Sequence, residues 1–265
     1  MNILATLNSG YLFQLAVMLR SITESTPEEN LDVYIMNRSL DESEFELTKK
    51  RVGSDRVRLI DIKTNAKELE GAPVTSRYPA EMYFRIFAAK YLPENIDKIL
   101  YLDPDLVVIN DIRPLYNTDI TGYYFAAASH VFGPMQTINE IRLNMEENSP
   151  YINSGVMLMN LSLLREKQDM SNVFEFIKNN KQRLILPDQD IISALYGPMI
   201  FPLNPYKYNM TERLLFRGGI GNNIDCDWVE KNSVIIHYLG RNKPWKEHYI
   251  GKMRKYYTDI AEKIK

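Results

Sequence analysis

The chain has 265 residues, of which 45% are hydrophobic and 25% are charged, and its formal net charge is −2. These values are ordinary for a globular protein and exclude a general electrostatic attraction to nucleic acid. The single cysteine, Cys226, excludes an intramolecular disulfide and a metal site built on paired thiolates.

The sequence carries no signal for export or membrane insertion. No apolar run approaches the ~20 residues of a membrane-spanning helix. The first residues contain no basic leader and no cleavage site. Together with the single cysteine, which fits a reducing compartment, these features predict a cytoplasmic protein.

The first sixty residues alternate between strand and helix patterns. Leu12, Leu15 and Leu19 recur at helical spacing, and Asp41 is placed to cap a second helix. This order predicts an α/β fold with a mostly parallel twisted sheet, flanked by helices and Rossmann-like in its N-terminal half. The predicted elements are strands at 3–7, 32–36 and 57–62, and helices at about 12–25 and 42–52.

The remaining chain is predicted to be less regular. Residues 64–79 are predicted as a long loop, 130–148 as an irregular flap, and 206–227 as loop-rich. The other predicted strands are 99–102, 123–128, 154–160, 198–202 and 234–237. The other predicted helices are 80–91, one or two within 161–183, one over 187–196, and a basic one at the C-terminus, with a short turn or helix at 111–117.

The most informative stretch is the apolar strand 99–102 followed by Asp103-Pro104-Asp105. Side chains alternate along an extended backbone, so two acids separated by one residue point the same way. Ligands bind at the carboxyl ends of strands in open α/β sheets, and two adjacent carboxylates favour a divalent cation. The alternative is a turn in which Asp103 caps the following segment.

Two further residues would complete a metal site with a phosphate contact. His237 ends a second apolar strand, although a histidine there is more often structural. Two carboxylates and one imidazole suit Mn²⁺ best and Mg²⁺ next. Gly240 allows close backbone approach and Lys243 offers a charge for phosphate, unless this segment is a solvated surface turn.

Three other polar positions are candidates for substrate contact. Arg85 lies in a nearly all-apolar helix, where a buried guanidinium needs an anionic partner unless its head reaches water. Asp188-Gln189-Asp190 begins a helix and could line a substrate, cap the helix, or do both. Asn153-Ser154-Gly155 precedes a strand and is similarly ambiguous.

The C-terminal residues 246–265 suggest a basic helix interleaved with aromatic residues. Such a helix can lie on an anionic lipid surface, which would make the protein peripheral at the inner face of a membrane. The alternative is a terminal helix docked on the protein with a solvated basic face.

Taken together, these motifs resemble the family 8 glycosyltransferases, in particular the bacterial lipooligosaccharide galactosyltransferase type. The resemblance extends from Asn2 to about Trp245. The motifs that carry it are Asn8 to Tyr11, Arg85, Tyr101-Leu102-Asp103-Pro104-Asp105, Asn153-Ser154-Gly155-Val156, Asp188-Gln189-Asp190, His237-Tyr238-Leu239-Gly240 and Lys243-Pro244-Trp245.

The resemblance implies a GT-A fold and a retaining, Mn²⁺-dependent hexosyltransferase with a UDP-sugar donor and a glycan or glycolipid acceptor. It implies that the metal ligands are Asp103, Asp105 and His237. It places Gln189, Asp188 and Asp190 as the catalytic candidates. The expected donor-binding residues are Thr6, Asn8, Tyr11, Arg85, Asp103, Asp105, Asn153, Asp188, Gln189, His237, Gly240 and Lys243.

Three positions depart from the family pattern. Asn8 stands where close members often carry an acid, Gly10 replaces a more usual asparagine, and His130 lies where some relatives have an acid. We expect a single domain over 1–265, with a nucleotide-binding half at about 1–130, an acceptor-side half at about 131–245 and the basic helix at 246–265. The competing functions are a nucleotidyltransferase and a non-catalytic nucleotide-sugar-binding protein.

Overall fold

A computed structural model describes residues 1–64, 80–221 and 223–265. Most of the loop predicted at 64–79 lies outside the described residues. The strands are β1 (Asn2–Thr6), β2 (Leu31–Asn37), β3 (Val57–Lys63), β4 (Lys98–Leu102), β5 (Leu106–Val108), β6 (Phe125–Ala128), β7 (Val156–Asn160), β8 (Ile200–Leu203) and β9 (Ile235–His237). The α-helices are α1 (Leu12–Ser25), α2 (Glu42–Val52), α3 (Ala88–Tyr91), α4 (Arg113–Tyr116), α5 (Pro134–Leu143), α6 (Leu161–Lys167), α7 (Met170–Asn180), α8 (Pro187–Tyr196), α9 (Pro205–Tyr208), α10 (Glu212–Gly221), α11 (Cys226–Asn232) and α12 (Arg254–Lys263).

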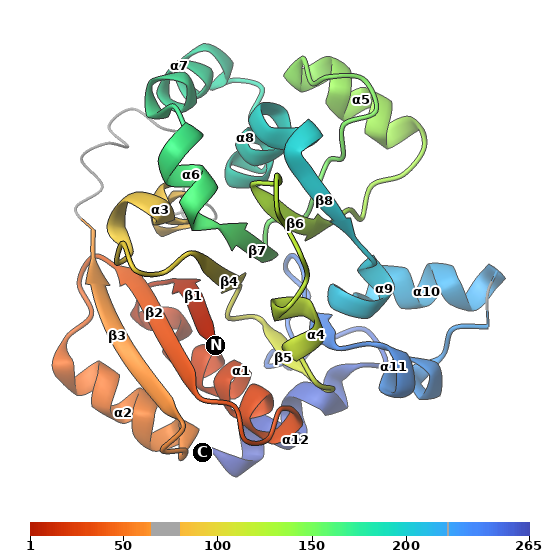
Figure 1. The fold of residues 1–265 in the computed structure, drawn as a ribbon. Coiled ribbons are helices and arrows are strands. Elements are labelled where there is room, and N and C mark those ends of the chain that lie inside the picture. The colour runs from red at the N-terminus through yellow and green to blue at the C-terminus, as the bar shows by residue number, and fades with distance from the viewer. Residues whose placement is uncertain (65–79, 222) are drawn as a thin grey trace.

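A seven-stranded sheet runs through the molecule in the order β3-β2-β1-β4-β7-β6-β8 (Figure 1). Strands β3, β2, β1 and β4 are mutually parallel, and β6 is parallel to β8. Only β7 is antiparallel to both of its neighbours in this sheet. The predicted mostly parallel α/β sheet is therefore confirmed.

Two apolar layers cover the sheet, one on each face. Helices α1 and α12 pack against one face (Figure 1), with Leu15 and Tyr257 among the buried side chains. Helices α3, α6 and α8 pack against the other, around Phe87 and Ile191. Strands buried on both faces need continuous apolar runs, which explains the sequences of β1 and β4.

A short antiparallel ribbon of β5 and β9 stands beside the main sheet. The sequence did not predict β5, because a three-residue strand directly after Asp105 carries too few residues to show a period. Its register places Leu106 opposite His237. The ribbon therefore brings a histidine from near the end of the chain beside the acids that follow β4.

Several predicted elements were wrong in part. The flap predicted at 130–148 contains α5, and the loop-rich segment at 206–227 contains α10, most of α9 and the start of α11. The helix predicted at 80–91 is a 3-10 segment, η3 (Ala80–Phe87), followed by α3. The basic C-terminal helix begins at Arg254 rather than at residue 246.

The aromatic residues near the C-terminus face the protein. Met253 and Tyr257 are buried in the core, and Trp245, Tyr249 and Tyr256 pack against it. This is the docked arrangement that the sequence left as the alternative to lipid contact. Among the described residues, no helix combines the length and the apolar character needed to cross a bilayer. A lipid contact through the basic residues of this segment stays a prediction.

Candidate active site

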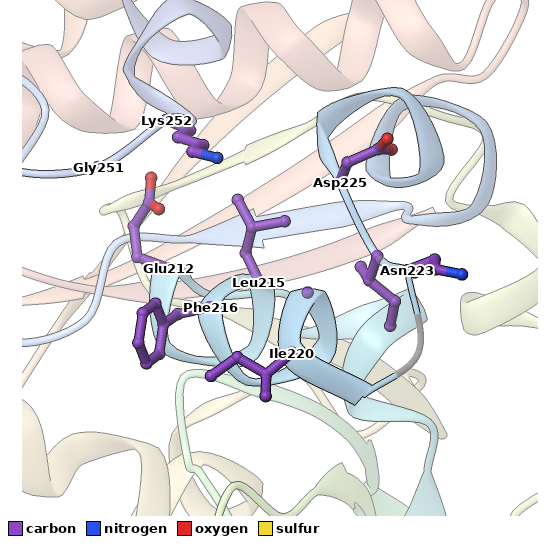
Figure 2. Close-up of a pocket in the computed structure, with 10 residues that line it drawn as sticks. Glu212, Leu215, Phe216, Ile220, Asn223, Asp225, Gly251 and Lys252 are labelled. Atoms are coloured by element: carbon purple, nitrogen blue, oxygen red, sulfur yellow. The ribbon is translucent and has the colours of Figure 1, made fainter.

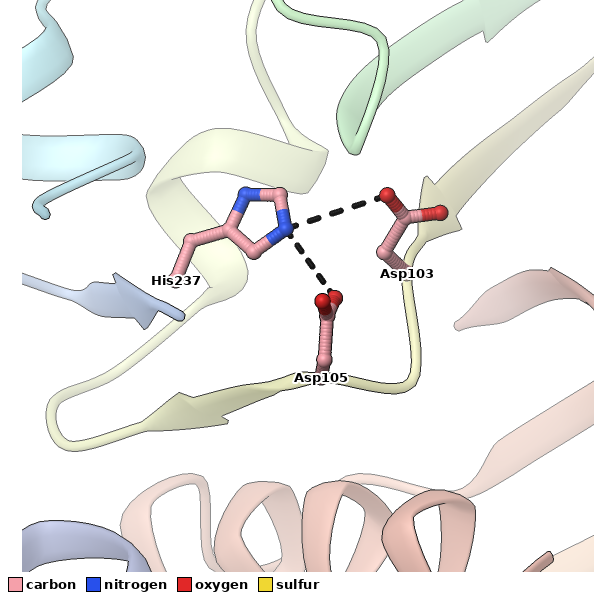
Figure 3. Close-up of side chains that lie close together, drawn as sticks. All are labelled: Asp103, Asp105 and His237. Carbon is pink, nitrogen blue, oxygen red and sulfur yellow. Dashed lines mark hydrogen bonds and ion pairs between the residues drawn. The ribbon is translucent and has the colours of Figure 1, made fainter. Parts of the chain in front are cut away.

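Asp103, Asp105 and His237 lie together at the end of β4 (Figure 3). The Nε2 atom of His237 is 3.1 Å from Asp105 Oδ1 and 3.7 Å from Asp103 Oδ2. One potential ligand atom from each residue lies within 4.8 Å of the other two. Two carboxylates and an imidazole at this spacing fit a divalent cation that accepts mixed oxygen and nitrogen ligands.

The position of Asp103 follows from the direction of β7. Because β7 is antiparallel to β4, its start lies beside the end of β4, and the Asp103 N–H donates to the carbonyl of Gly155 at 2.8 Å. Tyr101 donates its hydroxyl to Asp103 Oδ1 at 2.6 Å, and Arg85 contacts the same oxygen at 3.0 Å. Oδ2 is the oxygen that faces His237, so Asp103 can offer it to a metal while Oδ1 remains held.

Asp105 is held by two basic side chains, Lys243 and His237. It accepts hydrogen bonds from Lys243 and contacts His237. Burial alone would raise the pKa of its carboxyl group, but His237 and Lys243 hold that pKa well below the usual range. Asp105 is therefore ionised at neutral pH, as a metal ligand requires.

Arg85 connects the two acids on either side of the site. Its guanidinium lies 3.0 Å from Asp103 Oδ1 and 3.0 Å from Asp188 Oδ2, and it lies over the Tyr101 ring at 4.3 Å. Burial opposes its charge, but Asp103, Tyr101 and Asp188 together raise the pKa of Arg85. The predicted anionic partner is confirmed, and Arg85 is only 5% exposed.

Asp188 and Gln189 sit in the first turn of α8 and face the same region. Asp188 accepts a hydrogen bond from Ser154 Oγ at 2.8 Å, and burial raises the pKa of its carboxyl group. Asn153 donates to Gln189 Oε1 at 3.2 Å. Helix α8 has no side-chain cap at its N-terminus, so Asp188 does not serve as the N-cap.

Asp190 is committed to the protein interior instead. Its carboxylate accepts hydrogen bonds from Tyr151 at 2.6 Å, from both terminal nitrogens of Arg142, and from the backbone N–H groups at 185 and 186. The residue is 0% exposed. The structure thus brings Asp188 and Gln189 to the site but directs Asp190 away from it.

The predicted donor-binding residues line two adjoining cavities. The larger, of about 650 Å³, is lined by Tyr11, Arg85, Asp103, Asp105, Asn153, Asp188, Gln189, His237, Gly240 and Lys243. The smaller, of about 190 Å³, adds Thr6 and Asn8 and shares Tyr11, Arg85 and both acids. Acidic and basic side chains therefore face one space that could hold a cation together with an anionic ligand.

A separate cavity of about 730 Å³ lies beside α10 (Figure 2). Leu215, Phe216 and Ile220 provide much of its lining, and Lys252 lies on its far side (Figure 2). It contains no grouping of metal ligands among the residues the structure describes. We assign the chemistry to the acidic site at the end of β4.

Sequence reasoning missed several residues that shape the site. Tyr101 links Thr6 to Asp103, since its hydroxyl is 3.2 Å from Thr6 Oγ1. Asn209 contacts His237 Nδ1 at 2.9 Å. Tyr101 lies in β4, directly before Asp103-Pro104-Asp105, so its position in a buried strand could have indicated a role near the acids. Asn209 lies in a segment without any recognisable motif. His130, which departs from the family pattern, contacts the backbone carbonyl of Asn209 at 2.8 Å.

Residues 2–249 match the sequence model of glycosyl transferase family 8. The chain is similar to lipopolysaccharide 1,2-glucosyltransferase of Escherichia coli (strain K12), with 28% identity over 99% of this chain and 78% of that protein. It is also similar to lipopolysaccharide 1,3-galactosyltransferase of Salmonella typhimurium (strain LT2), with 24% identity over 92% of this chain and 72% of that protein.

Solved structures share the fold. The galactosyltransferase LgtC, crystallised with donor and acceptor sugar analogues, superposes with a TM-score of 0.84 at 22% identity, covering 100% of this chain and 96% of that one. GlyE of Streptococcus pneumoniae TIGR4 gives a TM-score of 0.73 at 20% identity over 98% of this chain and 59% of that one. The fold is therefore the GT-A fold that the motifs implied.

Proposed function

The chain belongs to glycosyl transferase family 8, and from this premise we propose that it transfers a hexose from a UDP-sugar to a saccharide or glycolipid acceptor with retention of anomeric configuration. The observation that carries the proposal is the convergence of Asp103, Asp105 and His237 in a cavity that also contains Arg85 and Lys243. A divalent cation and a diphosphate require this combination of acidic and basic groups.

We propose that Asp103, Asp105 and His237 hold Mn²⁺, with Mg²⁺ as the alternative ion. The donor set contains two oxygens and one nitrogen, which suits these ions better than zinc. A bound ion would offset the negative charge of the diphosphate and so favour departure of the nucleotide. The role of the protein is to hold these side chains oriented, through Tyr101 and Arg85 for Asp103 and through Lys243 for Asp105.

Lys243 and Gly240 are proposed to bind the diphosphate. The Lys243 ammonium donates to Asp105 and, at 2.7 Å, to the Tyr238 carbonyl, so its charge is held at the cavity wall. Gly240 has a backbone φ angle of +74°, which residues with a side chain rarely adopt, and it lines the same cavity. An exposed backbone turn of this kind allows close approach of phosphate oxygens.

Thr6, Asn8 and Tyr11 are proposed to surround the nucleoside. They line the smaller cavity next to Asp103 and Asp105. Tyr11 is partly exposed and packs edge-on against Trp245 at 6.4 Å between ring centroids, which leaves an aromatic surface for a base. Asn8 accepts a hydrogen bond from the Gly10 N–H, which fixes the side chain at the rim.

Asn153, Asp188 and Gln189 are proposed to contact the sugar, with Arg85 beside them. The amide of Gln189 can orient the donor and stabilise positive charge at the anomeric carbon through its oxygen. Asp190 is sequestered by Arg142 and Tyr151, so no carboxylate beyond Asp188 is left to act as a nucleophile among the catalytic candidates. We therefore propose a front-face mechanism, in which the acceptor attacks from the side on which UDP leaves.

The relatives named above support glucose or galactose as the donor hexose and a lipopolysaccharide or other surface glycan as the acceptor. We propose that residues 1–265 act as one catalytic domain, because cavity residues come from both the 1–130 and the 131–245 halves. We propose a cytoplasmic location. UDP-sugars are available in the cytoplasm, and its reducing conditions suit the free Cys226.

The decisive experiment is a panel of UDP-sugars assayed for hydrolysis and transfer with Mn²⁺, Mg²⁺ or excess chelator. We expect UDP release with UDP-glucose or UDP-galactose, greatest with Mn²⁺. Release of pyrophosphate from a nucleoside triphosphate and a sugar phosphate would instead identify a nucleotidyltransferase. Tight binding of a UDP-sugar with no release of UDP in the presence of acceptor glycans would identify a binding protein.

A further inference from the structure

Asn209 is a buried polar residue to which the proposed mechanism gives no task. It follows α9 directly and is 0% exposed. Its side-chain oxygen lies 2.9 Å from His237 Nδ1, and its side-chain nitrogen donates to Asn153 Oδ1 at 2.9 Å. Asn153 in turn donates to Gln189 Oε1 at 3.2 Å. One side chain thus connects the metal ligand to the two amides proposed to face the sugar.

One backbone group fixes the direction of the hydrogen bonds that connect Asn153, Asn209 and His237. The Gly155 N–H, which can only donate, lies 3.2 Å from Asn153 Oδ1 and identifies that atom as the acceptor. Asn209 must therefore present its NH₂ group to Asn153 and its oxygen to His237. An oxygen acceptor requires a proton on His237 Nδ1, whereas Asp105 Oδ1, 3.1 Å from Nε2, would favour a proton on the other nitrogen. A neutral ring with its proton on Nδ1 leaves the Nε2 lone pair free for a cation between His237, Asp103 and Asp105.

The backbone fixes Asn209 in this position from both sides. Its N–H donates to the Pro205 carbonyl at 3.0 Å, which ends α9. The next residue, Met210, donates to Ile235 at 2.9 Å and accepts from the His237 N–H at 2.7 Å. The β-bridge between Met210 and Ile236 thus holds the backbone of Asn209 beside that of His237, and the contacts with His237 and Asn153 hold the amide itself.

We propose that Asn209 is a positioning residue that fixes the Nδ1–H tautomer of His237 and couples this ligand to Asn153 and Gln189. The inference rests on the proposed metal site. A neutral imidazole in water favours a proton on Nε2, which would block the nitrogen that faces the acids. Partners of this kind typically change metal affinity by about 10–100-fold when they are removed.

Three variants separate the two connections of Asn209. Asn209→Ala removes both of them. Asn209→Asp keeps an acceptor for His237 Nδ1–H but cannot donate to Asn153. Asn204→Ala is the control, because the Asn204 side chain caps the same helix, α9, through the N–H groups of Tyr206 and Lys207 without touching His237.

Two measurements compare the variants: the tautomer of His237, and the Mn²⁺ affinity together with turnover. The first is nitrogen NMR of the histidine rings in alkaline, metal-free buffer, which reports the tautomer directly. The chain has only 3 histidines, so a His237→Gln sample assigns the signal. The second is calorimetric titration with Mn²⁺ in the presence of UDP, followed by turnover measurements on the same samples.

We expect the wild type, Asn209→Asp and Asn204→Ala to show a protonated Nδ1 on His237, and Asn209→Ala to move the proton to Nε2. We expect Mn²⁺ affinity to fall about 10–100-fold in Asn209→Ala. Asn209→Asp should retain Mn²⁺ affinity within about threefold but lose turnover, because Asn153 and Gln189 lose their support.

An unchanged tautomer in Asn209→Ala, or an equal loss of Mn²⁺ affinity in Asn204→Ala, would overturn the inference. Failure of the wild type to bind Mn²⁺ would instead count against the proposed metal site. In that case the NMR measurement would still decide whether Asn209 sets the tautomer of His237, so the two failures are distinguishable.

Discussion

Gly155 lies directly against His237, so that a β-carbon built on Gly155 would collide with the imidazole ring and would lie 2.6 Å from Asp103 Oδ2. Real β-carbons do not approach other atoms this closely, and neither side chain can move without leaving the cation site. The third position of Asn153-Ser154-Gly155 is therefore restricted to glycine by its distance from two predicted metal ligands.

We expect Gly155→Ala to reduce Mn²⁺ affinity by about 100-fold or more, because both ligands must shift. Titration calorimetry with Mn²⁺ measures the effect, with Gly219→Ala in α10 as the control. A β-carbon at Gly219 would meet only the Ile224 carbonyl oxygen, at 3.3 Å. Wild-type affinity in Gly155→Ala would show that the cation does not use Asp103 and His237 together.

Asp105→Asn should abolish metal-dependent turnover while the protein remains folded. The amide keeps the size of the side chain but loses the charge that the cation needs. Asp41→Asn is the matched control, since Asp41 forms a capping box with Glu44 at the start of α2 and asparagine caps a helix nearly as well as aspartate. Turnover with and without chelator compares the two variants. Chelator-resistant activity in the wild type would contradict the metal site.

Gln189→Ala should lower turnover by about 10-fold or more while UDP affinity stays nearly unchanged, because the side chain is proposed to touch sugar and not nucleotide. Gln168→Ala is a suitable control, because that amide donates to the Ile86 carbonyl and the Tyr196 hydroxyl and does not line either site cavity. Steady-state kinetics and UDP titration measure the two quantities.

An α-linked donor should give an α-linked product, and a β-linked product by NMR would refute retention.

Asp190→Asn should act on stability rather than on chemistry. The partly buried Arg142 would lose its charged partner, at a cost of about 3 kcal/mol in the free energy of unfolding. Denaturant titration measures the loss, and Asp169→Asn, at the exposed cap of α7, should have a much smaller effect, because asparagine caps a helix nearly as well as aspartate. Mass spectrometry with a slow fluorinated donor provides the opposing test, because a hexosyl adduct on Asp190 would require a covalent mechanism.

His130 should make the protein less stable as the pH falls. Burial lowers its pKa to about 4 from 6.5, so the unfolded chain binds more protons between these values. The contribution of neutral His130 is fully present above about pH 6.5 and declines toward pH 4, by at most about 3 kcal/mol. Denaturant titrations across this range should give a smaller pH dependence for His130→Gln than for the wild type. Parallel curves would show that His130 is not neutral in the folded protein.

The parts of the fold that sequence patterns predicted are those in which each residue is buried on a regular period. Strands β1, β2 and β4 and helix α1 belong to this class, and the acids after β4 could be recognised because a buried strand delivers them. Helix α5 was missed because Met135, Ile138 and Ile141 are exposed, so its apolar positions do not mark a buried face.

Helix α10 was missed because Gly218 and Gly219 disfavour a helix. Gly218 is nevertheless required there, since a β-carbon would lie 2.7 Å from Ile224 Cδ1. Within the site, the direct contacts of Arg85 followed from charge and burial. The contact between Asn209 and His237 could not be predicted, because it depends on a β-bridge between segments that show no shared pattern.

The pairing of β5 with β9 has a consequence for how the protein is made. It joins Asp105 to His237 across 132 residues of chain, one of the longest separations in the molecule. Loop closure over such a span is entropically slow compared with pairing of neighbouring strands. On the ribosome, the parallel strands can form while the histidine is still being synthesised. The nascent chain therefore carries two acids with no imidazole, and the proposed cation site is complete only when the last strand has docked.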